Sequence, residues 1–155
     1  MASSNRLKGF GLGALIVLIA GTAFATLSSR DAGALEITVY RSPTCGCCSK
    51  WIAHLEANGF EVVAHDTEDM TSVKIENGIR RELSSCHTAV IDGYVIEGHV
   101  PAEDIQRLLR ERPAVAGVAV PGMPIGSPGM EGPNPQAYDV LTFDAVGNTS
   151  VFASH

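Results

Sequence analysis

The chain has 155 residues, of which 45% are hydrophobic and 18% are charged, so it is not a charged disordered polymer and fits one domain with appendages. A formal net charge of −6 argues against a nucleic-acid-binding protein, because binding to phosphates requires a basic face. Four cysteines are too few for a disulfide-dense miniprotein, and three of them fall within four residues, unlike structural staples.

The first 25 residues have the pattern of a secretory signal peptide. Arg6 and Lys8 precede an uncharged stretch that ends in Ala23-Phe24-Ala25, a small-x-small cleavage site. An uncleaved anchor is the alternative, since the stretch approaches the about 17 residues that a span needs. Cleavage after Ala25 would remove two positive charges and move the net charge from −6 to −8. In both cases we expect a periplasmic or exported protein, with residues 26–34 as a linker.

Strand and helix patterns alternate from residue 35. Residues 35–40 alternate with period two and predict a strand, and residues 47–58 predict a helix that stops at Asn58-Gly59. A second strand is expected at 61–65 and a short helix at 71–77. Asp92-Gly93 then predicts a type I′ turn between two strands within 88–97. Pro101 opens a last helix.

This order, βαβαββα, predicts an α/β protein with a thioredoxin-like core over residues 35–113. Residues 114–155 differ in composition, because six of the eight prolines lie at 113–135 together with several glycines. We expect a long loop there, containing Met123 and Met130. A C-terminal β-hairpin, 138–143 with 149–152, would return this loop to the core, so that 114–155 packs on it.

The chemistry concentrates in Thr44-Cys45-Gly46-Cys47-Cys48, at the start of the first predicted helix. Cys45 and Cys48 have the C-x-x-C spacing of thiol redox sites, and a helix N-terminus favours the thiolate. Because the thiolate is both nucleophile and metal ligand, this position leaves both roles open. A third cysteine, Cys47, between the pair favours soft metal ions, since it would invite wrong disulfides in a redox catalyst.

The predicted hairpin adds more candidate ligands. With Ile91 opposite Tyr94, the register extends to place Cys86 opposite His99, with Cβ atoms within about 6 Å. In a thioredoxin-like fold, Cys86, His87 and His99 would then face the cysteine motif. Thioredoxins place a cis-proline before this strand, whereas residues 84–88 contain no proline.

Ligand softness separates zinc from copper. Thiolates with imidazole alone would suit zinc, whereas thioethers favour Cu(I), so Met123 and Met130 favour copper over zinc. Each methionine is alternatively a packing residue. The cysteines are alternatively structural, with a disulfide from Cys47 to Cys86 as one arrangement. His54 and His65 fit ordinary surface and loop positions, and His155 carries no pattern.

Four co-linear motifs resemble the CopG-type periplasmic copper proteins, a family long labelled a domain of unknown function. The motifs are residues 40–48 (YRSPTCGCC), 85–90 (SCHTAV), 93–101 (GYVIEGHVP) and 121–131 (PGMPIGSPGME). The resemblance runs from about residue 35 to residue 143. It implies a thioredoxin-like fold, copper binding and copper resistance, and it allows for a cluster of several ions and for a redox role. The family's cysteines fall on Cys45, Cys47, Cys48 and Cys86, and its Met-containing loop on Met123 and Met130.

We therefore expect a periplasmic protein that sequesters Cu(I). The predicted ligands are Cys45, Cys47, Cys48, Cys86, His87, His99, Met123 and Met130. Copper ions, and other periplasmic copper-handling proteins, are the expected partners, with the membrane included only if the N-terminal segment is uncleaved. Two alternatives remain, a thiol-disulfide or copper redox enzyme using Cys45 and Cys48, and a secreted structural domain with two disulfides.

Overall fold

The computed structural model describes residues 35–155, so the predicted signal peptide (1–25) and linker (26–34) lie outside the described residues. In this part of the chain, no helix has the length and apolar character needed to cross a membrane. The elements are β1 (Leu35–Arg41), α1 (Gly46–Ala57), β2 (Phe60–Asp66), α2 (Met70–Glu76), a 3₁₀ turn (Arg81–Leu83), β3 (His87–Ile91), β4 (Tyr94–Glu97), α3 (Ala102–Glu111), β5 (Gly117–Ala119), β6 (Asp139–Phe143) and β7 (Thr149–Ser154).

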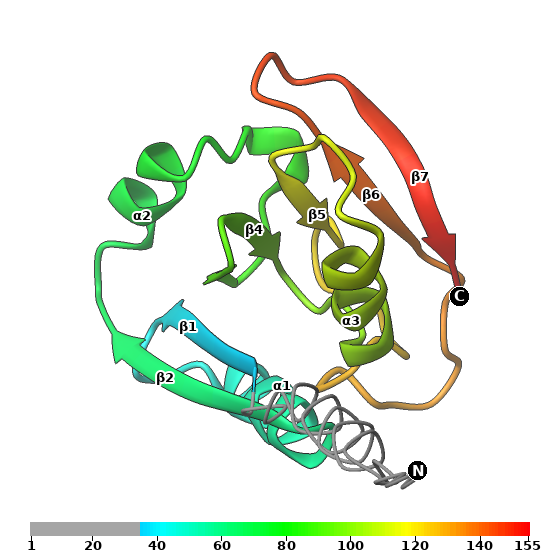
Figure 1. Ribbon diagram of the computed structural model, residues 1–155. Helices are drawn as coiled ribbons and strands as arrows, with labels where there is room; N and C mark the ends of the chain where they lie inside the picture. The colour runs from blue at the N-terminus through cyan, green and yellow to red at the C-terminus, as the bar shows by residue number, and fades with distance from the viewer. Residues whose placement is uncertain (1–34) are drawn as a thin grey trace, which may run out of the picture. The chain divides into compact units, whose positions relative to one another are not determined.

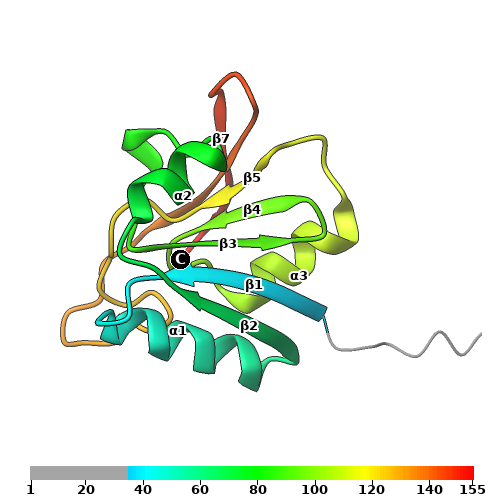
Figure 2. The ribbon, with the colours of Figure 1, turned by 90° about the vertical axis from the view of Figure 1, so that its left-hand side faces the viewer.

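Within residues 35–155, seven strands form one mixed sheet in the order β2-β1-β3-β4-β5-β6-β7. β1 pairs parallel with β2, and β4 parallel with β5, while the other neighbouring strands are antiparallel. Figure 2 shows β1, β3, β4 and β5 side by side. The predicted α/β class and the order βαβαββα are confirmed up to α3, while the thioredoxin-like core stays a prediction that rests on this order.

Strand β5 corrects the prediction of an unbroken loop after residue 113. Its three residues are too short for alternation to show in the sequence, and only pairing with β4 and β6 makes them a strand. A Cβ atom on Gly117 would lie 1.9 Å from the carbonyl oxygen of Val95, so glycine is what lets β5 approach β4. Residues 114–155 thus contribute three strands to the same sheet as the core, together with the loop that holds both methionines.

The two faces of the sheet carry different helices. Helices α1 and α3 share the main hydrophobic core, in which Trp51, Leu55, Ile105 and Leu108 are fully buried. Helix α2 reaches the opposite face through Lys74, which bonds to Thr88 and Glu97. Figure 1 shows α2 and α3 on opposite sides of β4. The core therefore forms mainly beneath α1 and α3, and α2 buries none of its own residues.

The β3–β4 hairpin has the predicted turn and register. Asp92 and Gly93 have φ values of 50° and 84°, as a type I′ turn requires. Thr88 pairs with Glu97, and Ile91 with Tyr94. Since β1 and β3 pair through Arg41 and His87, the segment that follows β1 lies beside the segment that precedes β3. This topology brings the cysteine motif and Cys86 to the same end of the paired strands β1 and β3.

Candidate metal centre

The start of α1 holds three of the four cysteines. Cys45 is the N-cap residue, and its sulfur accepts the backbone N–H of Cys48 at 3.3 Å. Cys47 and Cys48 lie in the first turn of the helix. Cys45 and Cys48 form a disulfide, while Cys47 and Cys86 are free thiols. The C-x-x-C pair thus occupies the predicted position, and the structure records it in the oxidised state.

All four sulfur atoms gather within 4.8 Å of one another. The Cys47 sulfur lies 3.4 Å from that of Cys45 and 3.8 Å from that of Cys86. The Cys48 sulfur lies 3.4 Å from that of Cys86. Once the disulfide is reduced, the cluster presents four thiol groups to a soft metal ion.

Cys86 also belongs to a second group, with His87 and His99. Its sulfur is 3.3 Å from Nδ1 of His87 and 3.1 Å from Nε2 of His99. The three ligand atoms of this group again lie within 4.8 Å of one another. The predicted juxtaposition of Cys86 and His99 beyond the hairpin ladder is therefore confirmed. One thiol links a sulfur-rich group to a nitrogen-containing group.

The two imidazoles are fully buried. Nδ1 of His99 donates to the carbonyl oxygen of Pro128 at 2.8 Å, which leaves the Nε2 lone pair facing Cys86. The ring of His87 stands 4.2 Å from that of Trp51, and its Nε2 has no hydrogen-bond partner among the described residues. Burial lowers the pKa of both histidines, and that of His87 lies well below its usual range. Neutral imidazole is the form that binds metal ions.

Cys86 is half-buried and protonated at neutral pH. Burial, followed by the neighbouring Cys47 thiol, raises the pKa of the Cys86 thiol to about 12. Since only the thiolate is a strong ligand, metal binding here must displace a proton. A bound metal cation would supply positive charge and so stabilise the Cys86 thiolate.

A buried polar network holds the Cys86 segment in place, and sequence reasoning did not find it. The Glu97 carboxylate is fully buried and forms an ion pair with Lys74 at 2.6 Å. It also accepts the backbone N–H of Ser85 at 2.6 Å and the hydroxyl of Thr88 at 2.7 Å. Glu97 therefore anchors the residue before Cys86. The one sequence signal for it is a glutamate opposite Thr88 on a central strand.

The Met loop, residues 121–131, folds back onto the start of α1. Gly129 has a φ of 84°, and a Cβ atom there would lie 2.8 Å from both the Cys47 carbonyl oxygen and the Trp51 nitrogen. Glycine is thus required for the loop to approach the helix backbone so closely. The same loop supplies the Pro128 carbonyl to His99. Loop and centre therefore form one packed unit.

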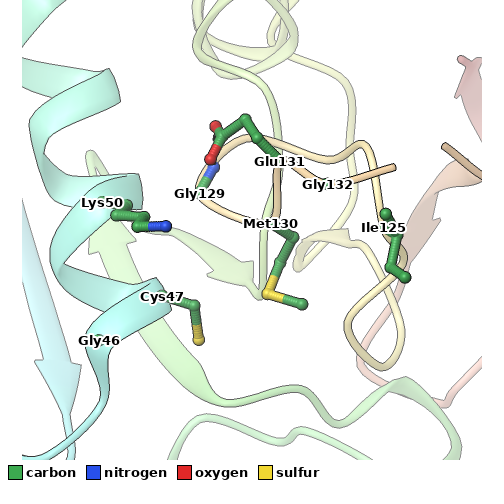
Figure 3. A pocket seen from close by; sticks show the side chains of 8 residues that line it. All are labelled: Gly46, Cys47, Lys50, Ile125, Gly129, Met130, Glu131 and Gly132. Carbon is green, nitrogen blue, oxygen red and sulfur yellow. Dashed lines mark hydrogen bonds between the residues drawn. The ribbon is translucent and has the colours of Figure 1, made fainter. Parts of the chain in front are cut away.

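The two methionines of the Met loop have different surroundings. Met130 lines a pocket of about 410 Å³ together with Cys47, and Figure 3 shows both sulfur atoms beside the same space. Met123 does not line this pocket, and the residue is 52% exposed. Met130 is thus placed next to the cysteine cluster, and ligation by either methionine stays a prediction.

The other histidines make structural contacts. Nε2 of His54 accepts the backbone N–H of Ala102, at the start of α3. His65 lies within β2 and stacks on Tyr40, and His155 contacts the Asp104 carboxylate at 2.7 Å. His54 therefore supplies a cap to α3, whose own N-cap residue, Pro101, makes no side-chain cap bond.

Comparisons with known proteins agree with this geometry. A family model described as "Protein of unknown function, DUF411" matches residues 83–130, which include Cys86, both buried histidines and both methionines. Two solved structures, titled "Copper resistance protein copG- Form 2" and "Copper resistance protein copG- Form 1", are each 52% identical to the chain with a TM-score of 0.74. Each covers 78% of this chain, which in turn covers 98% and 97% of theirs. A search of curated proteins found no significant match.

Proposed function

The chain belongs to the family of the copper resistance protein CopG, and from that premise we propose that it binds and sequesters Cu(I) in the periplasm. Copper is the cargo in this proposal. Thiolates of Cys45, Cys47, Cys48 and Cys86 provide the affinity, while His87, His99 and the Met-loop thioethers complete the coordination. The N-terminal segment with the signal-peptide pattern supports an exported location.

The observation that carries the proposal is the shared position of Cys86. Its sulfur is within ligand reach of three other sulfurs and of two imidazole nitrogens. A bridging thiolate can bind two soft ions at once, so the two groups provide for more than one copper ion. Thiolates and imidazoles also bind zinc, but the Met130 thioether beside Cys47 favours Cu(I).

Full loading requires the reduced form of the cysteine pair. Opening the Cys45–Cys48 disulfide takes two electrons and two protons from a thiol reductant and yields two thiols. Each thiol that then binds Cu(I) gives up its proton. Copper capacity is therefore expected to be higher in the reduced protein than in the disulfide form.

The test is a competition titration on anaerobically reduced protein. Cu(I) is offered against a Cu(I) chelator, and Zn(II) against a zinc chelator, with metal content measured after desalting. We expect Cu(I) to be retained far more tightly than Zn(II). Equal or better retention of zinc contradicts the proposal. The Cys47→Ser variant should lose copper while its Cys45–Cys48 disulfide still forms.

A second function, thiol-disulfide or copper redox catalysis, is favoured by one observation, the disulfide at the N-terminus of α1. If Cys47 is a spare thiol, Cys47→Ser should leave copper stoichiometry unchanged and reduce a model disulfide at least as fast as the parent protein. Measuring both properties in this one variant separates the two functions.

A further inference from the structure

The candidate ligands of the centre differ in their exposure to solvent. Cys48, His87 and His99 are fully buried. Cys45, Cys47 and Cys86 are partly exposed, and of these three Cys47 lines the pocket of about 410 Å³ at the start of α1. The pocket therefore approaches the centre from the Cys47 side.

The opposite wall of this pocket belongs to the Met loop and its continuation to Gly132. Figure 3 shows the Met130 sulfur and the Cys47 sulfur bordering one space, with Lys50 and Glu131 above them in this view. The lining also includes Gly46 and Gly132, whose lack of a side chain leaves room for a ligand to approach closely. The lining thus combines two soft donors with two groups of opposite charge.

The Met-loop wall of the pocket is held in place by hydrogen bonds within the loop and by packing on α1. Within the loop, Gly126 N–H bonds to the Met130 carbonyl and Met130 N–H to the Ser127 carbonyl. The Glu131 carboxylate accepts the N–H of Gly129, which itself packs against the backbone of α1. The Met-loop wall of the pocket is therefore held by contacts within the protein.

We propose that this pocket is the port through which copper enters the centre, and that it accepts Cu(I) carried by a small thiol compound. This inference rests on the proposed function. In the exchange step, a bond between Cu(I) and a carrier sulfur breaks, a bond to the Cys47 sulfur forms, and the Cys47 proton passes to the departing carrier thiolate. Copper stays Cu(I) throughout. Met130 holds the ion from the opposite wall. As the ion passes inward, a bond to the Cys86 sulfur replaces the bond to Cys47, and the Cys86 proton returns to the Cys47 sulfur.

The size and charge of the pocket support this choice of carrier. Its volume falls within the range of about 300–1,000 Å³ typical of small-molecule sites. Lys50 and Glu131 place one charge of each sign in the lining, which suits a carrier that bears both carboxylate and ammonium groups, such as a thiol peptide. A larger protein donor would have to place its metal-bearing residues into the same restricted space.

The first experiment narrows the pocket without changing a sulfur atom. Gly132→Phe is suitable because a Cβ atom at this position meets only the Ile125 side chain, at 3.2 Å. Ile125→Trp narrows the same pocket by a second route, and Val151→Phe, at a 59% exposed position on β7, is the matched control. Cu(I) is supplied to reduced protein either as its glutathione complex or as its acetonitrile complex, and uptake is followed by stopped flow.

We expect Gly132→Phe and Ile125→Trp to slow uptake from the glutathione complex by about tenfold or more, within the about one to three decades over which association rates vary among variants of one interface. Uptake from the small acetonitrile complex, copper number at equilibrium and the behaviour of Val151→Phe should stay as in the parent protein. Parent-like uptake from the glutathione complex in both pocket variants overturns the port.

A copper-free measurement separates failure of the port from failure of the proposed function. In the disulfide form, iodoacetamide should label Cys47 before Cys86, and a bulky maleimide should label Cys47 more slowly in Gly132→Phe than in the parent. Preferential labelling of Cys86, or equal maleimide rates, overturns the port whether or not copper binds. The expected labelling without copper binding overturns the proposed function instead, and with it the copper cargo of the pocket.

Discussion

The sulfur of Cys86 lies 3.1 Å from Nε2 of His99, across the open end of the β3–β4 hairpin. Because the same sulfur faces Cys47 and Cys48, Cys86 is the residue whose loss should affect both ligand groups. We expect Cys86→Ser to weaken Cu(I) binding beyond the about 10- to 100-fold typical of outer-shell changes at metal sites. It should also reduce the copper number more than Cys47→Ser does.

Chelator competition and metal analysis on the Cys86→Ser and Cys47→Ser variants test this ranking. Circular dichroism of each variant serves as the control for folding. A Cys86→Ser protein that binds as much copper as Cys47→Ser would show that the two groups do not share a bridging thiolate.

The Met loop leads to a second prediction. Methionine to leucine keeps the side-chain volume and removes the sulfur, so it separates ligation from packing. The Met123→Leu, Met130→Leu double variant should stay folded and bind fewer Cu(I) ions or bind them more weakly. Because Met130 borders the pocket beside Cys47, we expect Met130→Leu alone to account for most of the loss. Unchanged copper number and affinity in the double variant would leave a site of cysteine and histidine only.

The buried Glu97 carboxylate leads to a prediction about stability. Its partner Lys74 has a side chain that is only 14% exposed, so removing one charge leaves the other without compensation in a largely dry environment. Glu97→Gln should lower the free energy of unfolding by about 3–5 kcal/mol. Urea denaturation measures this directly.

Glu82→Gln is the matched control, since the Arg80–Glu82 pair is more than half exposed on both sides. Its loss should cost about 0–1 kcal/mol. Equal effects of the two substitutions would mean that the Glu97 network does not hold the Cys86 segment in place.

The buried histidines predict a dependence of stability on pH. Burial lowers the pKa of His87 and His99 in the folded protein below the about 6.5 of an unfolded chain. The unfolded chain therefore binds more protons than the folded one below that pH, and protonation favours unfolding. The metal-free disulfide form should lose stability as the pH falls from about 7.5 to about 5.5.

Urea midpoints across this range provide the measurement. His87→Phe should flatten the curve, because it removes one of the buried titrating groups and keeps an aromatic ring beside Trp51. His65→Gln, at an exposed position on β2, should leave the slope as it is in the parent protein. A midpoint that rises toward acid pH would contradict the assignment.

Short-range patterns were enough to predict the hairpin and the cysteine motif. An Asp-Gly turn between alternating strands specifies the register, and the register places Cys86 near His99. The helix start at Gly46 follows from the break after β1. These features depend on residues that are neighbours in sequence, so local interactions are enough to predict them.

Other features depend on contacts between distant segments. Strand β5 exists only through pairing on both sides, and the Pro128 carbonyl reaches His99 only after the loop has folded. Met123 and Met130 both follow Pro-Gly, so their local sequences do not distinguish them. Only the folded loop places one beside Cys47 and leaves the other half exposed.

Trp51 is the one tryptophan of the chain, and its ring lies 4.2 Å from that of His87. Its indole N–H is held by the Val100 carbonyl at 2.8 Å, so the ring has a single, fixed orientation. Emission from the protein above the tyrosine background therefore comes from one fluorophore in contact with a candidate ligand. The protein carries its own optical reporter, and events at the centre can be followed in unlabelled material.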